Sequence, residues 1–337
     1  MGRLRRSDPS EPGLTRRRRG RGFSYHHPDG RPVTEPETLE RVAHLAIPPA
    51  WRDVWICPDA QGHIQATGTD DAGRRQYLYH EDWVTKRDAE KFERVLALGA
   101  RMPRVRARVA ELVAGRGLGR ERVLAAALRM LELGIFRVGG HEYAQEHGSY
   151  GLSTLLREHV EVHRGRIHIA YTAKGGIERR TVLDDADLLV VVRALLRRRD
   201  PNPELLGYWN QGWHNVRAED INDFLRELAG DGFTAKDVRT WNATVLAAVA
   251  LAVEERPESR RGRRRAVANA LSDVAEELGN TPAVCRKSYV DPRVLEAYER
   301  GLTIRPAVLR IGSTELTRPE VRDSLERAVL RLLRGRR

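Results

Sequence analysis

One phenol near the carboxyl end of the chain stands in a setting that could support chemistry. The stretch "GNTPAVCRKSYVDP", residues 279–292, places Tyr289 after two cations and before an Asp-Pro pair. The leading glycine is typical of a helix end, and Thr-Pro and Asp-Pro are each typical of a helix start. The spacing therefore predicts that Tyr289 lies in the last turn of a short helix, where it either meets a ligand or packs the junction.

A phenol is a weak nucleophile at neutral pH because its pKa is about 10. It attacks phosphorus only where cations hold the phosphate and stabilise the charge of the transition state. The expected helpers are arginine forks on the non-bridging oxygens and a proton donor for the leaving oxygen. Cations at the ends of helices and strands are therefore the residues to look for.

Three segments supply such cations. "FTAKDVRTWNAT" predicts a helix start that carries Lys236 and Arg239 on one face. Arg137 directly follows a long predicted helix, and Lys174 precedes a Gly-Gly hairpin turn. Each alone is simply a basic residue on the surface of a basic protein. Together with Tyr289 they indicate a phosphate site.

The elements that must position these residues fall into two parts. Residues 23–86 contain short β-branched and aromatic runs between Asp/Gly-rich turns, with one helix near residues 35–46. From residue 87 to 337 the apolar spacing is helical, apart from alternating segments over residues 160–183 that predict hairpins. We therefore expect an α+β chain with a small β-rich N-terminal domain and a larger, mainly helical catalytic domain. Residues 1–22 precede both.

Composition favours a polyanionic partner. The 337 residues include 59 Lys and Arg against 47 Asp and Glu, a formal net charge of +12. The first 22 residues hold eight arginines with little apolar content, which predicts a disordered basic tail. The two cysteines suit a reducing, cytoplasmic compartment, and no apolar run is long enough to span a membrane. The chain has no phosphate-binding Walker loop, which argues against ATP use.

Four motifs, in order, resemble those of a type IB DNA topoisomerase of the small bacterial and poxviral kind. They are "DDAGRRQYLYHEDW", "FRVGGHEYAQEHGSYGLSTL", "KDVRT" and "NTPAVCRKSYVDP". The resemblance runs from about Phe23 to Thr303. It implies a monomer that clamps double-stranded DNA, near the nucleoid in the cytoplasm. It also implies relaxation of supercoils through single-strand cleavage, strand rotation and religation, with no metal, ATP or other cofactor.

The resemblance implies a role for each catalytic candidate. Tyr289 is the expected nucleophile and forms a 3′-phosphotyrosyl bond, while Arg137 and Arg239 grip the scissile phosphate. Lys174 is expected to donate a proton to the departing 5′ oxygen. Asn280 departs from the family pattern, because the viral enzymes and most relatives carry His there. An amide can donate a hydrogen bond to the phosphate but cannot titrate.

The resemblance also implies contacts with DNA. Lys236 is expected to be an accessory cation near the site. For Tyr77 and Tyr79, core packing of one of the two remains an alternative. The expected DNA-contacting residues are Gln76, Tyr77, Tyr79, Tyr150 and Arg286.

Two other functions fit part of the sequence. A tyrosine recombinase or integrase shares the chemistry, but such enzymes usually carry His-x-x-Arg where this chain has Lys236 and Arg239. A non-catalytic basic protein that coats DNA accounts for the charge but leaves the five catalytic candidates unexplained. Relaxation of a plasmid in the presence of EDTA separates these alternatives.

Overall fold

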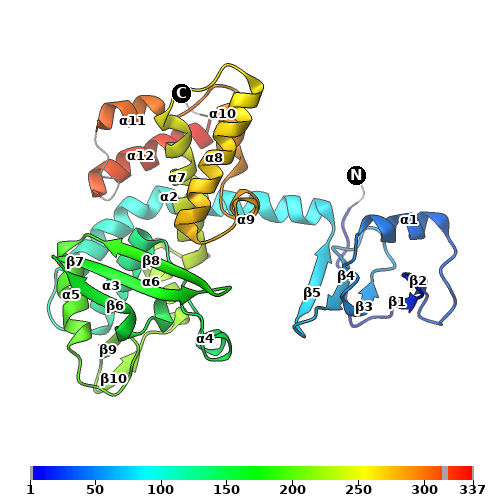
Figure 1. Ribbon diagram of the computed structural model, residues 1–337, viewed down its shortest axis with the longest axis horizontal. Coiled ribbons are helices and arrows are strands. Elements are labelled where there is room, and N and C mark those ends of the chain that lie inside the picture. Colours follow the sequence, from blue (N-terminus) through cyan, green and yellow to red (C-terminus); the bar gives the residue numbers. More distant parts are fainter. Residues whose placement is uncertain (1–2, 313–317, 336–337) are drawn as a thin grey trace. The chain divides into compact units, whose positions relative to one another are not determined.

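The chain, described by a computed structural model over residues 3–312 and 318–335, divides into two compact units, Met1–Lys91 and Phe92–Arg337 (Figure 1). Helix α2 (Glu81–Val113) runs across this division. The predicted α+β class, with a β-rich first part and a mainly helical remainder, is confirmed. The boundary expected after residue 86 falls inside α2 and stays a prediction.

The first unit is an antiparallel sheet of five strands in the order β2-β1-β3-β4-β5, with the short helix α1 (Pro36–His44). Its small core includes Leu14, Val42 and Ile56, all nearly inaccessible to solvent. The strands are β1 (Leu14–Arg19), β2 (Gly22–His26), β3 (Arg52–Ile56), β4 (Ile64–Thr69) and β5 (Arg75–Tyr79).

The arginine-rich segment near the N-terminus belongs to this sheet. The sequence predicts a disordered tail over residues 1–22, and the structure shows that this is wrong, since β1 lies between β2 and β3. Leu14 is buried, and the Arg16 guanidinium donates to three carbonyl oxygens of the loop between α1 and β3. Inner-strand pairing and these hydrogen bonds compensate for the lack of apolar residues.

The second unit is mainly helical. Helix α7 is largely buried; its small side chains allow close packing, and Trp241 fills the space over Gly99. The apolar half of α7 lies in the core. Besides α2, the helices are α3 (Arg120–Gly134), α4 (His141–His147), α5 (Ala186–Leu196), α6 (Ala218–Ala229), α7 (Ala235–Val253), α8 (Arg260–Leu278), α9 (Pro282–Ser288), α10 (Pro292–Glu299), α11 (Arg305–Ile311) and α12 (Pro319–Leu333), with the 3-10 turns η1 (Leu152–Thr154) and η2 (Arg157–His159).

Two small antiparallel sheets interrupt these helices. One has three strands in the order β6-β7-β8, and the other pairs β9 with β10. The hairpins predicted over residues 160–183 are confirmed. Their turns include residues 164–165 and 175–176, and all four of these residues have positive φ, as tight turns between twisted strands require. The strands are β6 (Val160–His163), β7 (Arg166–Ala173), β8 (Ile177–Leu183), β9 (Gly207–Trp209) and β10 (Trp213–Asn215).

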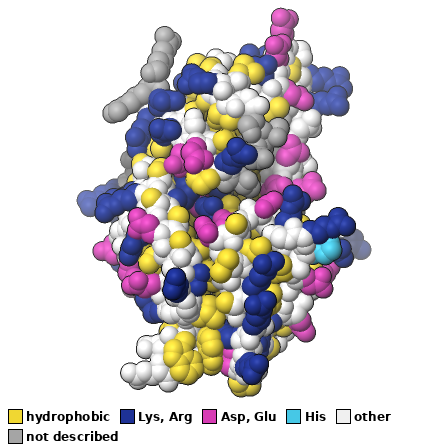
Figure 2. Space-filling model, turned by 90° about the vertical axis from the view of Figure 1, so that its left-hand side faces the viewer, with side chains coloured by type: hydrophobic (Ala, Val, Ile, Leu, Met, Phe, Trp, Pro, Cys, Tyr) yellow, Lys and Arg dark blue, Asp and Glu magenta, His cyan; other side chains and the backbone are white. Residues whose placement is uncertain are grey.

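One face of the second unit carries charges of both signs. Figure 2 shows Lys and Arg side chains interspersed with Asp and Glu, and hydrophobic side chains gathered at the lower end, where Figure 1 places β9 and β10. Trp209 and Trp213 on these strands are exposed. This face is therefore not a continuous basic surface. None of the helices within the described ranges has the length and apolar character to cross a bilayer.

Candidate active site

Tyr289 lies at the end of the short helix α9. Helix α9 starts at Pro282 after the N-cap Thr281, whose hydroxyl accepts from the backbone N–H of Val284, and Tyr289 is its C-cap residue. This confirms the predicted junction. The carbonyl of Tyr289 accepts a hydrogen bond of 3.2 Å from the Thr244 hydroxyl of α7. The backbone of the phenol is therefore fixed to a buried helix, while its ring remains half-buried.

Arg137 lies just beyond the end of α3, as predicted. Two hydrogen bonds fix its segment, from the N–H of Leu152 to the Arg137 carbonyl (2.9 Å) and from the N–H of Ser153 to the Val138 carbonyl (2.7 Å). A Cβ on Gly151 would lie 2.5 Å from Gly139, so this close approach of two chain segments requires glycine. The Arg137 backbone is therefore held on both sides.

Arg239 lies on the first turns of α7 and is buried, with only 3% of its surface exposed. Its guanidinium donates to the carbonyl of Ile135, which follows α3, and to the carbonyl of Leu278, at the end of α8. Its Cζ atom lies 5.3 Å from the centre of the Tyr289 ring. Burial and then the charge of Arg137 lower the pKa of Arg239 to about 10, which still leaves it protonated at neutral pH.

Most of the predicted catalytic residues meet at one cleft of about 350 Å³. Five separate segments bring them there: the turn after α3, the loop between α4 and η1, the β7–β8 hairpin, the start of α7 and the end of α9. Lys174 stands at the exposed tip of the hairpin, between Ala173 and the Gly-Gly turn. The predicted residues that line the cleft are Arg137, Tyr150, Lys174, Lys236, Arg239 and Tyr289.

Asn280 does not line the cleft itself but contacts a residue that does. It follows Gly279, the left-handed C-cap of α8, and its Oδ1 accepts a hydrogen bond from Nη2 of Arg137. Its Nδ2 is buried and has no hydrogen-bond partner within the described ranges. A buried amide N–H without a partner costs about 1–3 kcal/mol.

The predicted DNA-contacting residues fall into separate places. Tyr77 and Tyr79 lie on one face of β5, each 44% exposed, with their rings stacked 6.1 Å apart. The alternative that one of them packs in the core is therefore wrong. Gln76, on the other face, donates to Asp70. These residues belong to the first unit, whereas Tyr150 and Lys236 belong to the cleft of the second.

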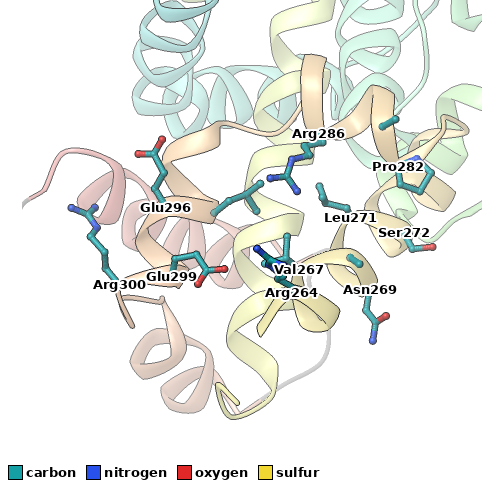
Figure 3. A pocket seen from close by; sticks show the side chains of 13 residues that line it. Arg264, Val267, Asn269, Leu271, Ser272, Pro282, Arg286, Glu296, Glu299 and Arg300 are labelled. Atoms are coloured by element: carbon teal, nitrogen blue, oxygen red, sulfur yellow. The ribbon is translucent and has the colours of Figure 1, made fainter. Parts of the chain in front are cut away.

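Arg286 lies apart from the cleft. Figure 3 shows it on the wall of a larger pocket of about 1130 Å³ between α8, α9 and α10. Val267 and Leu271 form part of an apolar floor, and Glu296 and Glu299 stand opposite. Tyr289 is not among the residues that line this larger pocket. The structure therefore does not bring Arg286 into the cleft that Tyr289 lines.

Arg179 on β8 is a neighbour of the cleft that the sequence analysis misses. Its Nη2 donates to the carbonyl of Gly134 (2.9 Å) and to that of Glu277 (2.7 Å). The signal was available, because Leu183 points inward on β8 and a period of two places residue 179 inward as well. An arginine at an inward position of a strand requires buried partners.

Comparisons with known proteins agree with this geometry. A family model described as "Eukaryotic DNA topoisomerase I, catalytic core" matches residues 80–305, and one described as "Bacterial DNA topoisomerase IB, N-terminal domain" matches residues 22–70. The chain is 31% identical to DNA topoisomerase 1B of Acanthamoeba polyphaga mimivirus, over 85% of this chain and 88% of the relative. It is 24% identical to DNA topoisomerase 1B of Vaccinia virus (strain Copenhagen), over 76% and 81% of the two chains.

A solved structure of the XerH site-specific recombinase bound to a palindromic difH substrate is also similar, at 15% identity and a TM-score of 0.36, over 58% of this chain and 51% of that one. So low a score carries no argument. The family model of the catalytic core, in contrast, spans about two thirds of the chain and includes all five catalytic candidates. The chain therefore belongs to the type IB DNA topoisomerases, and it is an enzyme that changes the topology of double-stranded DNA.

Proposed function

We propose that Tyr289 cleaves one DNA strand by attacking the scissile phosphate. Its phenolic oxygen forms a bond to phosphorus as the bond from phosphorus to the 5′ oxygen breaks. The phenolic proton passes to water, and Lys174 gives a proton to the departing 5′ oxygen. Rotation of the free 5′ end relaxes the DNA, and the reverse reaction reseals the strand. The phosphotyrosyl bond conserves the energy of the phosphodiester, so neither ATP nor a metal ion is needed.

The observation that supports this proposal most strongly is the uncompensated positive charge beside the phenol. Arg137 donates to an amide oxygen and a carbonyl, and Arg239 donates to two carbonyls. In the described part of the chain, neither forms an ion pair with a carboxylate. Guanidinium groups that share a cleft without an anion favour a bound phosphate. In this proposal both grip its non-bridging oxygens.

Asn280 supplies the third contact to the phosphate in this mechanism. The acceptor end of its amide is used by Arg137, so this role requires the buried, unpartnered Nδ2 to turn toward the phosphate when DNA binds. Charge accumulates on the non-bridging oxygens in the transition state, so an N–H donor to them stabilises that state more than the ground state. The amide therefore stands in for the histidine of the viral enzymes as a donor, without their titration.

The remaining contacts with DNA are assigned by chemistry and exposure. Lys236 and Tyr150 contact the strand near the scissile phosphate, and the exposed pair Tyr77 and Tyr79, with Gln76, contacts the duplex from the first unit. The enzyme acts as a monomer that clamps DNA, in the cytoplasm at the nucleoid. The affinity for DNA then falls steeply with salt, because many phosphates are contacted.

Replacement of the nucleophile tests the proposal directly. Tyr289→Phe removes one hydroxyl, so we expect DNA binding to persist while plasmid relaxation in EDTA and the covalent adduct on a nicked oligonucleotide both disappear. Tyr208→Phe is a matched control, since Tyr208 stacks on His214 in the β9–β10 hairpin, outside the cleft. A Tyr289→Phe protein that still forms the adduct contradicts the assignment.

A further inference from the structure

Arg179 is a partly buried cation that the mechanism above does not use. It pairs in register with Tyr171 of β7, which is 3% exposed, so both side chains point to the interior of the unit. Arg180, the next residue, is exposed on the opposite face of β8. A guanidinium that points inward on a strand must find partners there, because an unpaired buried charge is strongly unfavourable.

The partners of Arg179 are main-chain carbonyls at two helix ends. Its Nη2 bridges the Gly134 carbonyl of α3 and the Glu277 carbonyl of α8, while its Nε is buried and unpartnered within the described residues. The last carbonyls of a helix have no partner inside the helix and carry its negative dipole end. Burial lowers the pKa of Arg179, and the nearby Tyr171 and Glu277 oppose this shift. The bridge is made by a charged donor, because arginine stays protonated in proteins.

These two carbonyls immediately precede the phosphate-binding segments. Gly134 is followed three residues later by Arg137, and Glu277 is followed three residues later by Asn280. Lys174 stands at the tip of the hairpin to which Arg179 belongs. A single guanidinium therefore joins the hairpin that carries the proton donor to both segments that hold the phosphate.

The fit around Arg179 is close on the side of α8. Gly279 has a φ of +59°, and a Cβ there would lie 3.2 Å from Nη1 of Arg179. A glycine at this helix end therefore serves both the left-handed cap and the approach of the guanidinium. The hairpin and the end of α8 are in contact with little room for a change in their relative position.

We propose that Arg179 is a positioning residue that holds the β7–β8 hairpin against the ends of α3 and α8, so that the Lys174 amine reaches the 5′ oxygen of the scissile phosphate. The proposal rests on the role of Lys174 as the proton donor. It assigns Arg179 no contact with DNA. Without this bridge, Arg137, Arg239 and Tyr289 keep the hydrogen bonds described above, but the hairpin tip can move. A displacement of about 1 Å lowers a rate by on the order of 10²-fold.

The test compares two substrates in single-turnover cleavage by the full-length protein. One has the natural 5′ oxygen, and the other has sulfur at the bridging 5′ position, which leaves without protonation because a thiol is far more acidic than an alcohol. Arg179→Met keeps the aliphatic stem and removes the donors. We expect it to cleave the oxygen substrate on the order of 10²-fold more slowly than the wild type, and the sulfur substrate at nearly the wild-type rate. Arg180→Met, on the opposite face of β8, is the matched control.

The outcomes separate this proposal from the proposed function. If Arg179→Met is equally slow on both substrates, or no slower than Arg180→Met, the positioning role is refuted. If Lys174→Ala itself gains nothing from sulfur, the proton-donor role is wrong instead. Should Arg179→Met not fold, as judged by near-ultraviolet circular dichroism, Arg179→Lys decides. It keeps one charged donor for one carbonyl, and we expect a smaller loss with the same recovery on sulfur.

Discussion

Asn280 offers the sharpest quantitative test of the site, because its two amide ends are used differently. Oδ1 accepts from Arg137, while Nδ2 is buried and has no partner among the described residues. If Nδ2 donates to the phosphate only when DNA is bound, Asn280→Ala removes one transition-state donor. Such a loss lowers the rate by about 10²–10³, or roughly 2.7–4 kcal/mol. The free energy of unfolding of the protein without DNA falls by less than this. The substitution also removes an unsatisfied buried N–H, which by itself costs about 1–3 kcal/mol.

Two further substitutions distinguish the ends of the amide. Asn280→Asp keeps an acceptor for Arg137 but has no N–H, and its negative charge repels the phosphate. We therefore expect Asn280→Asp to be slower than Asn280→Ala. Asn280→His retains activity, because a neutral imidazole has one nitrogen that accepts and one that donates. The order of rates is therefore wild type and His, then Ala, then Asp.

The assay is single-turnover cleavage of an oligonucleotide from about pH 5 to pH 9, the span in which a histidine titrates. The wild type should show no change near about pH 6.5 that arises at this position, whereas the His variant acquires one. The free energy of unfolding of each variant, measured with urea, separates a catalytic loss from a structural one. An Ala variant that cleaves like the wild type at every pH refutes the reasoning, and Asn280 then serves only the helix junction.

Two other predictions concern the fold. Deletion of residues 1–20 removes the inner strand β1 with the buried Leu14, so we expect the first unit to lose its cooperative unfolding transition, measured by circular dichroism. Deletion of residues 1–4 is the control and should leave this transition intact. Equal stability of the two shortened proteins would contradict the prediction. Burial lowers the pKa of His159, whose Nδ1 accepts from a backbone N–H, so the unfolded chain binds more protons once the pH falls below about 6.5. The stabilisation by neutral His159 is therefore present above that pH and lost below it. His159→Asn does not titrate at this position, so its free energy of unfolding, measured with urea, should fall less than that of the wild type between about pH 7.5 and 5.5.

The surroundings of Tyr289 could be predicted because their signals are local. A glycine cap, a Thr-Pro start and an Asp-Pro start place three helix boundaries within residues 279–292, and the structure has all three. The position of Lys174 beside a hairpin turn follows in the same way from the Gly-Gly pair. Each of these features depends on a few neighbouring residues, and each is present in the structure.

Features that depend on distant segments could not be predicted from local patterns. The arginines of β1 resemble a disordered tail until the strand is paired on both sides and Arg16 reaches carbonyls in the loop before β3. The bonds of Arg239 join the start of α7 to the ends of α3 and α8, which lie about 100 and about 40 residues away along the chain, respectively. In both cases the amino-acid composition reports the charge of the arginines, but it does not report the distant carbonyl groups that bind them.

The choice of partners for the buried arginines bears directly on function. Among the described residues, three arginines are less than a tenth exposed: Arg106, Arg198 and Arg239. Arg106 pairs with Glu132 and Glu326, and Arg198 pairs with Asp200 at 2.5 Å. The carboxylates around Arg106 outweigh the effect of its burial and raise its pKa, whereas burial and a second arginine lower the pKa of Arg239.

The unit therefore neutralises buried arginines where they serve the fold, and Arg239 is the exception within the described ranges. Carbonyl dipoles orient its guanidinium beside the Tyr289 ring without cancelling its charge. In the mechanism proposed above, a carboxylate in their place would hold the side chain equally well but would compete with the phosphate for it. On that proposal the free protein keeps a charge whose counter-ion arrives with the DNA, and the interaction is strongest in the transition state, where the phosphate oxygens carry the most charge.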